Sequence, residues 1–103
     1  MIYQLVYVSR AAPELDGAAL EAMLATARRN NAKTNVTGML LHHGDSFIQV
    51  LEGGESAVER LFNHISNDPR HSVENVMLRT IQEKRAYDSL WMGYKRTEPG
   101  LHV

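Results

Sequence analysis

The sequence contains no cysteine among its 103 residues, and this absence excludes several kinds of site. Without thiols the chain forms no disulfide framework, no thiolate metal site and no cysteine nucleophile. It also lacks any run of roughly 20 apolar residues, the length that a membrane-spanning helix requires. The first apolar pattern begins at Ile2, so we expect no signal peptide. These features are compatible with a reducing cytoplasm, and we expect a cytoplasmic protein that contacts no membrane.

An excess of charge of one sign is also missing. Eleven Lys and Arg residues face 12 Asp and Glu residues, the net charge is −1, and neither sign is gathered in a block. A nucleic-acid binder carries a clustered basic face, so we expect no nucleic-acid partner. The five histidines are spread over several predicted elements, so we expect no metal. Motifs of serine hydrolases and phosphate-binding loops are absent, and we do not expect an enzyme.

Apolar residues make up 44% of the chain, which is enough for the core of one domain. Stretches rich in β-branched and aromatic residues predict five strands. These strands are expected at residues 2–10, 36–43, 46–52, 73–84 and 89–96.

Helical spacing of apolar residues predicts two helices between these strands. The first is expected to begin at an Asp16 N-cap, supported by a hydrophobic staple of Leu15 and Leu20, and to carry Arg28 and Arg29 in its last turn. The second is expected to begin at a capping box, to present an apolar stripe and to end at residues 67–69. The capping box consists of Ser56 and Glu59, and the stripe of Val58, Leu61, Phe62 and Ile65.

The order βαββαββ predicts an α+β fold, a ferredoxin-like two-layer sandwich. Its five-stranded mixed sheet carries two helices on one face, because right-handed crossovers place both helices on the same side. We expect residues 1–97 to form the domain and residues 98–103 a C-terminal tail.

The stretch FIQVLEGG at residues 47–54 places a glutamine in the middle of a predicted strand. Burying an unpaired amide costs roughly 1–3 kcal/mol, so a partner for Gln49 is expected. Strand alternation puts Gln49, Tyr7 and Met92 on the face beneath the helices. Asn30 and Asn31 flank the apolar stripe of the first helix near its predicted end. Such uncharged donors and acceptors suit a neutral planar ligand with an imide edge.

Each of these residues also has a structural explanation. Tyrosine in a strand is commonly a packing residue, and a strand glutamine often faces solvent. Adjacent asparagines at a helix end commonly cap the helix, because Asn tolerates the left-handed conformation. Their joint placement, rather than any one of them, favours a binding site.

The chain resembles the BLUF domains, blue-light sensors that bind FAD without a covalent bond. The resemblance covers nearly the whole sequence, and its motifs stand in the order and spacing of that family. The matching pieces are LVYVSRAA (5–12), ARRNNAKTNVTGMLL (27–41), FIQVLEGG (47–54), NDPRH (67–71) and MGY (92–94).

The resemblance implies a role for each site residue. Tyr7 would give an electron and a proton to the photoexcited flavin, and Gln49 would bridge the Tyr7 hydroxyl and the flavin edge. Asn30 and Asn31 would hold the carbonyl and imide edge of the ring. Asp68 would touch the ribityl or phosphate tail. FAD is the implied cofactor, with FMN and riboflavin as alternatives.

The chain departs from the family at two places. The family's last strand usually carries Trp-x-Met, whereas this chain has the run Leu90-Trp91-Met92. Alternation places Met92 on the flavin side and Trp91 on the opposite face, unless a β-bulge reverses this. His64 stands where relatives can place an arginine, which bears on the contact with the phosphate tail.

Three functions fit these observations. The first is a blue-light photoreceptor module that signals to an effector. The second is a light-independent ferredoxin-like domain that binds a small molecule and regulates a partner. The third is an acylphosphatase-like enzyme, in which Arg10 would belong to an anion-binding loop.

The face opposite the helices is expected to be an interface. Alternation predicts one apolar patch there, and patches beyond a few hundred Å² are rare on monomers. We expect a second copy of the chain or an effector to cover this face. The predicted patch consists of Val6, Val8, Ile48, Val50 and Trp91.

Overall fold

The computed structural model describes residues 1–11, 16–69 and 71–97. Its elements follow one another in the order βαββαββ, as the sequence predicts. They are β1 (Ile2–Ala11), α1 (Gly17–Thr34), β2 (Thr37–His43), β3 (Ser46–Gly53), α2 (Glu55–Ser66), β4 (His71–Gln82) and β5 (Gly93–Thr97).

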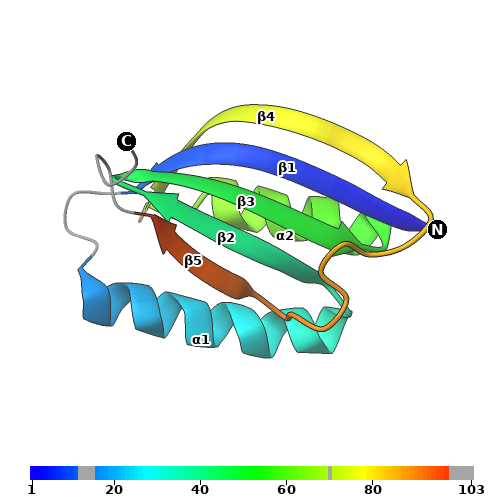
Figure 1. The fold of residues 1–103 in the computed structure, drawn as a ribbon, viewed down its shortest axis with the longest axis horizontal. Helices are drawn as coiled ribbons and strands as arrows, with labels where there is room; N and C mark the ends of the chain where they lie inside the picture. The colour runs from blue at the N-terminus through cyan, green and yellow to red at the C-terminus, as the bar shows by residue number, and fades with distance from the viewer. Residues whose placement is uncertain (12–15, 70, 98–103) are drawn as a thin grey trace.

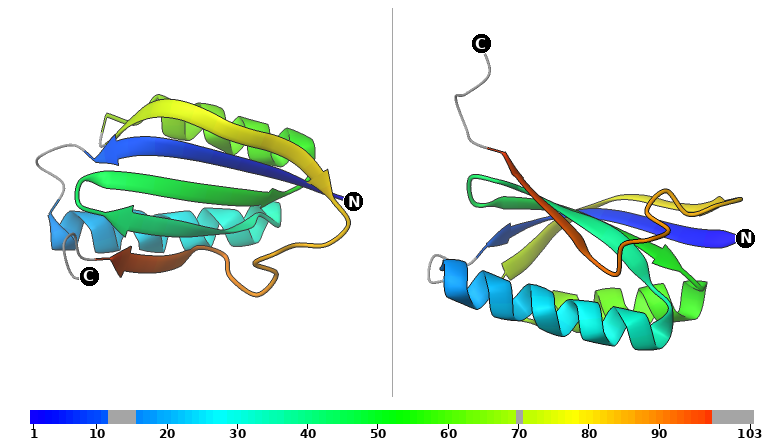
Figure 2. Two further views of the ribbon diagram at one scale, coloured as in Figure 1. Left: turned by 45° about the horizontal axis from the view of Figure 1, so that its top comes forward. Right: turned by 60° about the horizontal axis from the view of Figure 1, so that its bottom comes forward.

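The five strands form one mixed sheet in the order β4-β1-β3-β2-β5. Neighbouring strands are antiparallel except for β2 and β5, which are parallel. Both helices lie on the same face of the sheet, as the right-hand view of Figure 2 shows. The predicted ferredoxin-like two-layer sandwich is therefore confirmed, and the opposite face carries no helix from the described part of the chain.

The core lies between the sheet and the helices. Alternate residues of β1 and β3 point into it, and Leu5, Tyr7 and Leu51 are completely buried there. From α2, Val58 and Phe62 pack onto the same layer. This alternation places one face of β3 under the helices and thereby fixes the position of Gln49.

The first helix begins as predicted and ends one turn later than predicted. The Asp16 side chain accepts a hydrogen bond from Ala19 N at 2.8 Å, whereas Leu15 of the predicted staple lies outside the described residues. The helix runs to Thr34 and is closed by Asn35 in the left-handed conformation, with φ 57°. Lys33, not the predicted arginines, therefore occupies the last turn, and the Asn30–Asn31 pair lies inside the helix.

The predicted capping box of the second helix is wrong. Gly54 is the N-cap residue and makes no side-chain cap. Glu59 instead accepts hydrogen bonds from the Tyr3 hydroxyl and from Arg79 Nε, the latter at 2.7 Å. The bond from Arg79 lowers the pKa of the Glu59 carboxyl. The Glu59 carboxylate therefore pairs with side chains of β1 and β4 instead of capping the N-terminal end of α2.

The last two strands differ from their predicted ranges. β4 begins and ends two residues earlier than predicted, and β5 begins only at Gly93. Residues 89–92 therefore belong to the connection between β4 and β5, which crosses from one edge of the sheet to the other (Figure 1). Strand alternation does not apply to Trp91 or Met92.

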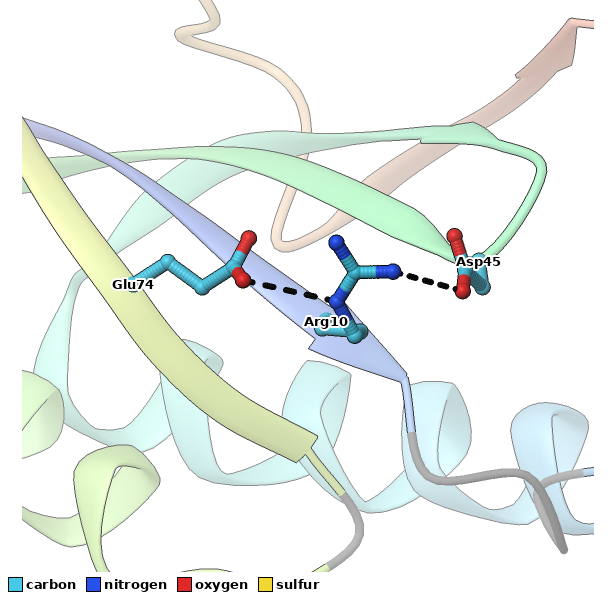
Figure 3. Close-up of polar contacts among 3 residues, drawn as sticks. All are labelled: Arg10, Asp45 and Glu74. Carbon is cyan, nitrogen blue, oxygen red and sulfur yellow. Dashed lines mark hydrogen bonds and ion pairs between the residues drawn. The ribbon is translucent and has the colours of Figure 1, made fainter.

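A two-residue turn joins β2 to β3. Gly44 has φ 62°, a conformation that favours glycine, and Asp45 completes the turn. Arg10 of β1 pairs with Asp45 at 2.8 Å and with Glu74 at 3.4 Å. Figure 3 shows the Arg10 side chain between these two carboxylates. These ion pairs are half-exposed, so they contribute little to stability. Arg10, which an acylphosphatase-like site requires as an anion ligand, contacts two carboxylates instead.

Candidate functional site

A cleft opens between the two helices above the middle of the sheet. It brings together five of the six predicted site residues, namely Asn30, Asn31, Gln49, Asp68 and Met92. Tyr7, the sixth, is completely buried. The remaining lining residues are Met23, Leu24, Thr26, Ala27, Leu40, Leu61, His64 and Ile65.

Tyr7 is the buried partner that Gln49 requires. The two residues face each other across β1 and β3, and the Tyr7 hydroxyl donates a hydrogen bond to Gln49 Oε1. The Phe62 ring packs edge-on against the Tyr7 ring at a centroid distance of 5.0 Å. Burial raises the pKa of Tyr7 far above its ordinary value, so the phenol stays protonated and remains a donor.

The other end of the Gln49 amide points toward Met92. Gln49 Nε2 lies 3.6 Å from Met92 Sδ, and both side chains are buried. A thioether sulfur is a weak acceptor. The donor end of Gln49 is therefore weakly held, whereas its acceptor end is fixed by Tyr7.

Two residues of α1 hold the segment that contains Met92. Asn31 is buried, and its Nδ2 donates to the Trp91 carbonyl at 2.7 Å. Arg28 Nε donates to the Met92 carbonyl at 2.9 Å. Asn31 thus links the cleft to the connection between β4 and β5. Sequence reasoning missed Arg28, because no pattern indicates which distant carbonyl a surface arginine will reach.

His64 lies in the last turn of α2, and Asp68 follows the helix directly after its C-cap residue. The Asp68 backbone N–H donates to the Ile65 carbonyl at 3.0 Å, which continues the last turn of the helix. Both side chains line the cleft, and Asp68 is half-buried. Arg70, which belongs to the same family motif, lies outside the described residues.

The chemistry of the cleft fits a flavin ring. Its polar groups near the sheet are amides, which offer both donors and acceptors, and its walls are mainly apolar. Within residues 1–11, 16–69 and 71–97 the acidic and histidine side chains form no group of three that could hold a metal ion. Neither helix is long and apolar enough to cross a membrane.

Comparison with known families and sequences gives one consistent result. The model of the BLUF family, described as sensors of blue-light using FAD, matches residues 2–93. Photoactivated adenylate cyclase subunit beta of Euglena gracilis is 41% identical over 98 residues. That alignment covers 94% of this chain and 11% of the relative, so the chain spans only a small part of that protein.

Solved structures agree with the sequence comparison. Klebsiella pneumoniae BlrP1 with FMN and cyclic diGMP superposes with a TM-score of 0.85 at 35% identity, covering 93% of this chain and 26% of that one. BlrB, a BLUF protein in its dark state, gives a TM-score of 0.84 at 31% identity and covers 92% of this chain and 72% of that one.

Proposed function

The chain belongs to the BLUF family, and we propose that Tyr7 and Gln49 form the switch of this flavin-binding blue-light sensor. The family match does not favour a light-independent small-molecule domain. The observation that carries the proposal is the hydrogen bond from the Tyr7 hydroxyl to Gln49 Oε1 at the base of the cleft.

Bound flavin supplies the absorption of blue light. FAD is the family cofactor, and FMN is present in one similar structure. In this proposal Asn30 and Asn31 pair with the polar edge of the ring from α1, Gln49 pairs with it from β3, and Met92 lies beside Gln49; all four residues line the cleft. In the same proposal Asp68, which follows α2 and lines the cleft, contacts the tail of the cofactor.

The switch uses the two unlike ends of one amide. With Tyr7 donating to Oε1, the amide presents Nε2 as a donor toward Met92 and the cleft. Exchanging the two ends would present an acceptor to the cleft and would remove the weak bond to the sulfur. Because the amide is buried, each arrangement is stabilised by the partners that it finds there.

Spectroscopy of the purified chain tests this function. A flavin sensor is yellow, and blue light shifts its absorption slightly to the red, with recovery in the dark. A colourless protein, or a yellow one whose spectrum is unchanged by light, would contradict the proposal.

Replacing Asn31 with alanine should weaken flavin binding. The change removes an amide from a partly dry cleft, and one lost hydrogen bond there costs about 1–3 kcal/mol, or a factor of roughly 5 to 150 in affinity. Equilibrium dialysis of the flavin measures the effect, with exposed Asn63→Ala as the control. If Asn31→Ala and Asn30→Ala both retain flavin like the unmodified chain, the ring is not held where we place it.

The module itself is not catalytic, and its output goes to an effector. Relatives such as the photoactivated adenylate cyclase subunit carry the same kind of domain in a much longer protein. Residues 1–97 are proposed as the sensor domain, whereas residues 98–103 lie outside the described part of the chain. A cytoplasmic location is proposed from the lack of cysteine.

The sheet face opposite the helices is the proposed partner surface. Ile48 is 38% exposed and lies opposite Val8 in the strand register, and Leu78 is 44% exposed and lies opposite Val6. Val50, which the sequence predicts to be part of this patch, is only 9% exposed. The predicted patch does not include Leu78, which the structure exposes. Trp91 is 43% exposed but lies in the connection before β5 rather than on a strand.

We expect the chain to self-associate through this face at high concentration. Ile48→Glu and Trp91→Glu should shift it toward the monomer, because each places a charge where apolar surface would be buried. Light scattering across a concentration series measures the effect, with Glu83→Lys as a control for surface charge. A chain that stays monomeric throughout and ignores both substitutions would show that this face binds no second copy.

A further inference from the structure

The connection between β4 and β5 (residues 83–92) is held at its beginning by a buried carboxylate. Glu52 is completely buried, and its Oε1 accepts a hydrogen bond from Tyr87 N at 2.8 Å. Its Oε2 accepts from Ala86 N at 2.9 Å and from Gln4 Nε2 at 3.0 Å. Burying a carboxylate is costly unless its oxygens are paired, and here both are paired with neutral donors.

Arg85 ties the same part of the connection to its surroundings. Its guanidinium donates to Thr37 Oγ1 at 2.8 Å, to the Glu52 carbonyl at 2.9 Å and to the Asn35 carbonyl at 2.8 Å. It therefore joins the connection to β2, to β3 and to the residue that closes α1. A single side chain fixes the beginning of the connection against three elements.

The end of the connection is held separately, next to the cleft. Gly38 N donates to the Leu90 carbonyl at 3.0 Å, and the bonds from Asn31 and Arg28 described above hold the next two carbonyls. The Met92 side chain then contacts Gln49. One strand, β3, thus touches the connection at both ends.

The two contacts from β3 lie on opposite faces of that strand. Gln49 and Glu52 are three residues apart, so Gln49 faces the cleft and Glu52 faces the other side of the sheet. Trp91 lies at the end of the connection, directly before Met92, and 43% of its surface is exposed. A fixed beginning of the connection limits how Trp91 can move when the contact between Gln49 and Met92 changes.

We propose that Glu52 is a positioning residue for signal output. It fixes the beginning of the β4–β5 connection, so that a change at Gln49 and Met92 alters the surroundings of Trp91. This inference rests on the proposed function and adds a residue on the opposite face of the sheet. A carboxylate is needed because both oxygens accept from backbone N–H groups, whereas a glutamine would turn an N–H₂ group toward one of those donors.

The variant Glu52→Gln tests the proposal with three readouts. Hydrogen exchange at one of the two amides, Ala86 or Tyr87, should become at least about tenfold faster, since that amide loses its acceptor. The light-induced red shift should keep its size, because the cleft residues are untouched. The light-dependent change in acrylamide quenching of Trp91, the single tryptophan of the chain, should be lost.

Matched variants separate positioning from general stability. Glu83→Gln makes the same charge change at an exposed site of the same connection and should behave like the unmodified chain. Arg85→Ala loosens the same end from another side and should also abolish the light response of Trp91. If Glu52→Gln does not fold, the Arg85→Ala variant alone tests whether the light response of Trp91 needs a fixed beginning of the connection. A merely stabilising role would lower the melting temperature but leave the response of Trp91 intact in the folded protein.

The outcomes of the two proposals are distinguishable. If the unmodified chain shows no red shift, the proposed function fails. If the unmodified chain shows the red shift but its Trp91 does not respond to light, the role of Glu52 is overturned while the sensor function stands. The same holds if Trp91 of the Glu52→Gln and Arg85→Ala variants responds to light as strongly as in the unmodified chain.

Discussion

Replacing Gln49 with leucine should abolish the red-shifted state while the flavin stays bound. Leucine fills a similar volume, so the apolar walls of the cleft remain, but the exchangeable amide is gone. The Tyr7 hydroxyl loses its acceptor in a buried position, which should destabilise the fold by about 1–3 kcal/mol. Light-minus-dark absorption spectra, recorded beside the ratio of flavin to protein, measure both effects.

Gln82→Leu is the matched control for this variant. Gln82 is exposed at the end of β4, far along the sheet from the cleft, and its loss should leave the photocycle unchanged. A normal red shift in Gln49→Leu would remove Gln49 from the switch, whatever the variant does to stability.

Replacing Tyr7 with phenylalanine should also abolish the red-shifted state and should make the flavin fluorescence brighter. The ring still packs against Phe62, but the hydroxyl that holds Gln49 Oε1 is lost. Fluorescence should rise because the family's implied electron donor has been removed from the site. Flavin emission intensity and the difference spectrum, taken on the same sample, measure the result.

Tyr3→Phe provides a close control. Tyr3 lies on the same strand and the same face as Tyr7, four residues earlier, and its hydroxyl bonds to Glu59 of α2 rather than to the cleft. We expect Tyr3→Phe to photocycle normally. A normal photocycle in Tyr7→Phe would mean that Tyr7 is only a packing residue.

The pairing of Tyr7 with Gln49 could be predicted because it depends on regular strands. β1 and β3 are paired without a register shift between them, so simple alternation places both side chains on the helix face. The predicted strand does not include Trp91 and Met92, because hydrogen bonds from α1 and β2 hold this part of the chain out of the sheet, yet Met92 still lies beside Gln49 in the cleft. Local patterns do not contain such long-range bonds.

Tertiary contacts also overrode two local helix signals. The capping box failed because Tyr3 and Arg79 bind the Glu59 carboxylate from the sheet. The first helix continued past Asn31 because that side chain bonds to the Trp91 carbonyl instead of closing the helix. Glu52 went unnoticed for the same kind of reason, since its partners lie more than 30 residues away in the sequence.

NMR can measure directly whether the Gln49 side chain changes its hydrogen-bond partners on illumination. The chain has three glutamines, Gln4, Gln49 and Gln82, so selective ¹⁵N labelling gives three pairs of side-chain amide signals. Gln49→Leu identifies the pair that belongs to Gln49. We expect that pair to move in the light and to return at the rate at which the absorption recovers, whereas the Gln82 pair stays in place. If the absorption switches while the Gln49 signals do not move, the account of the switch is wrong.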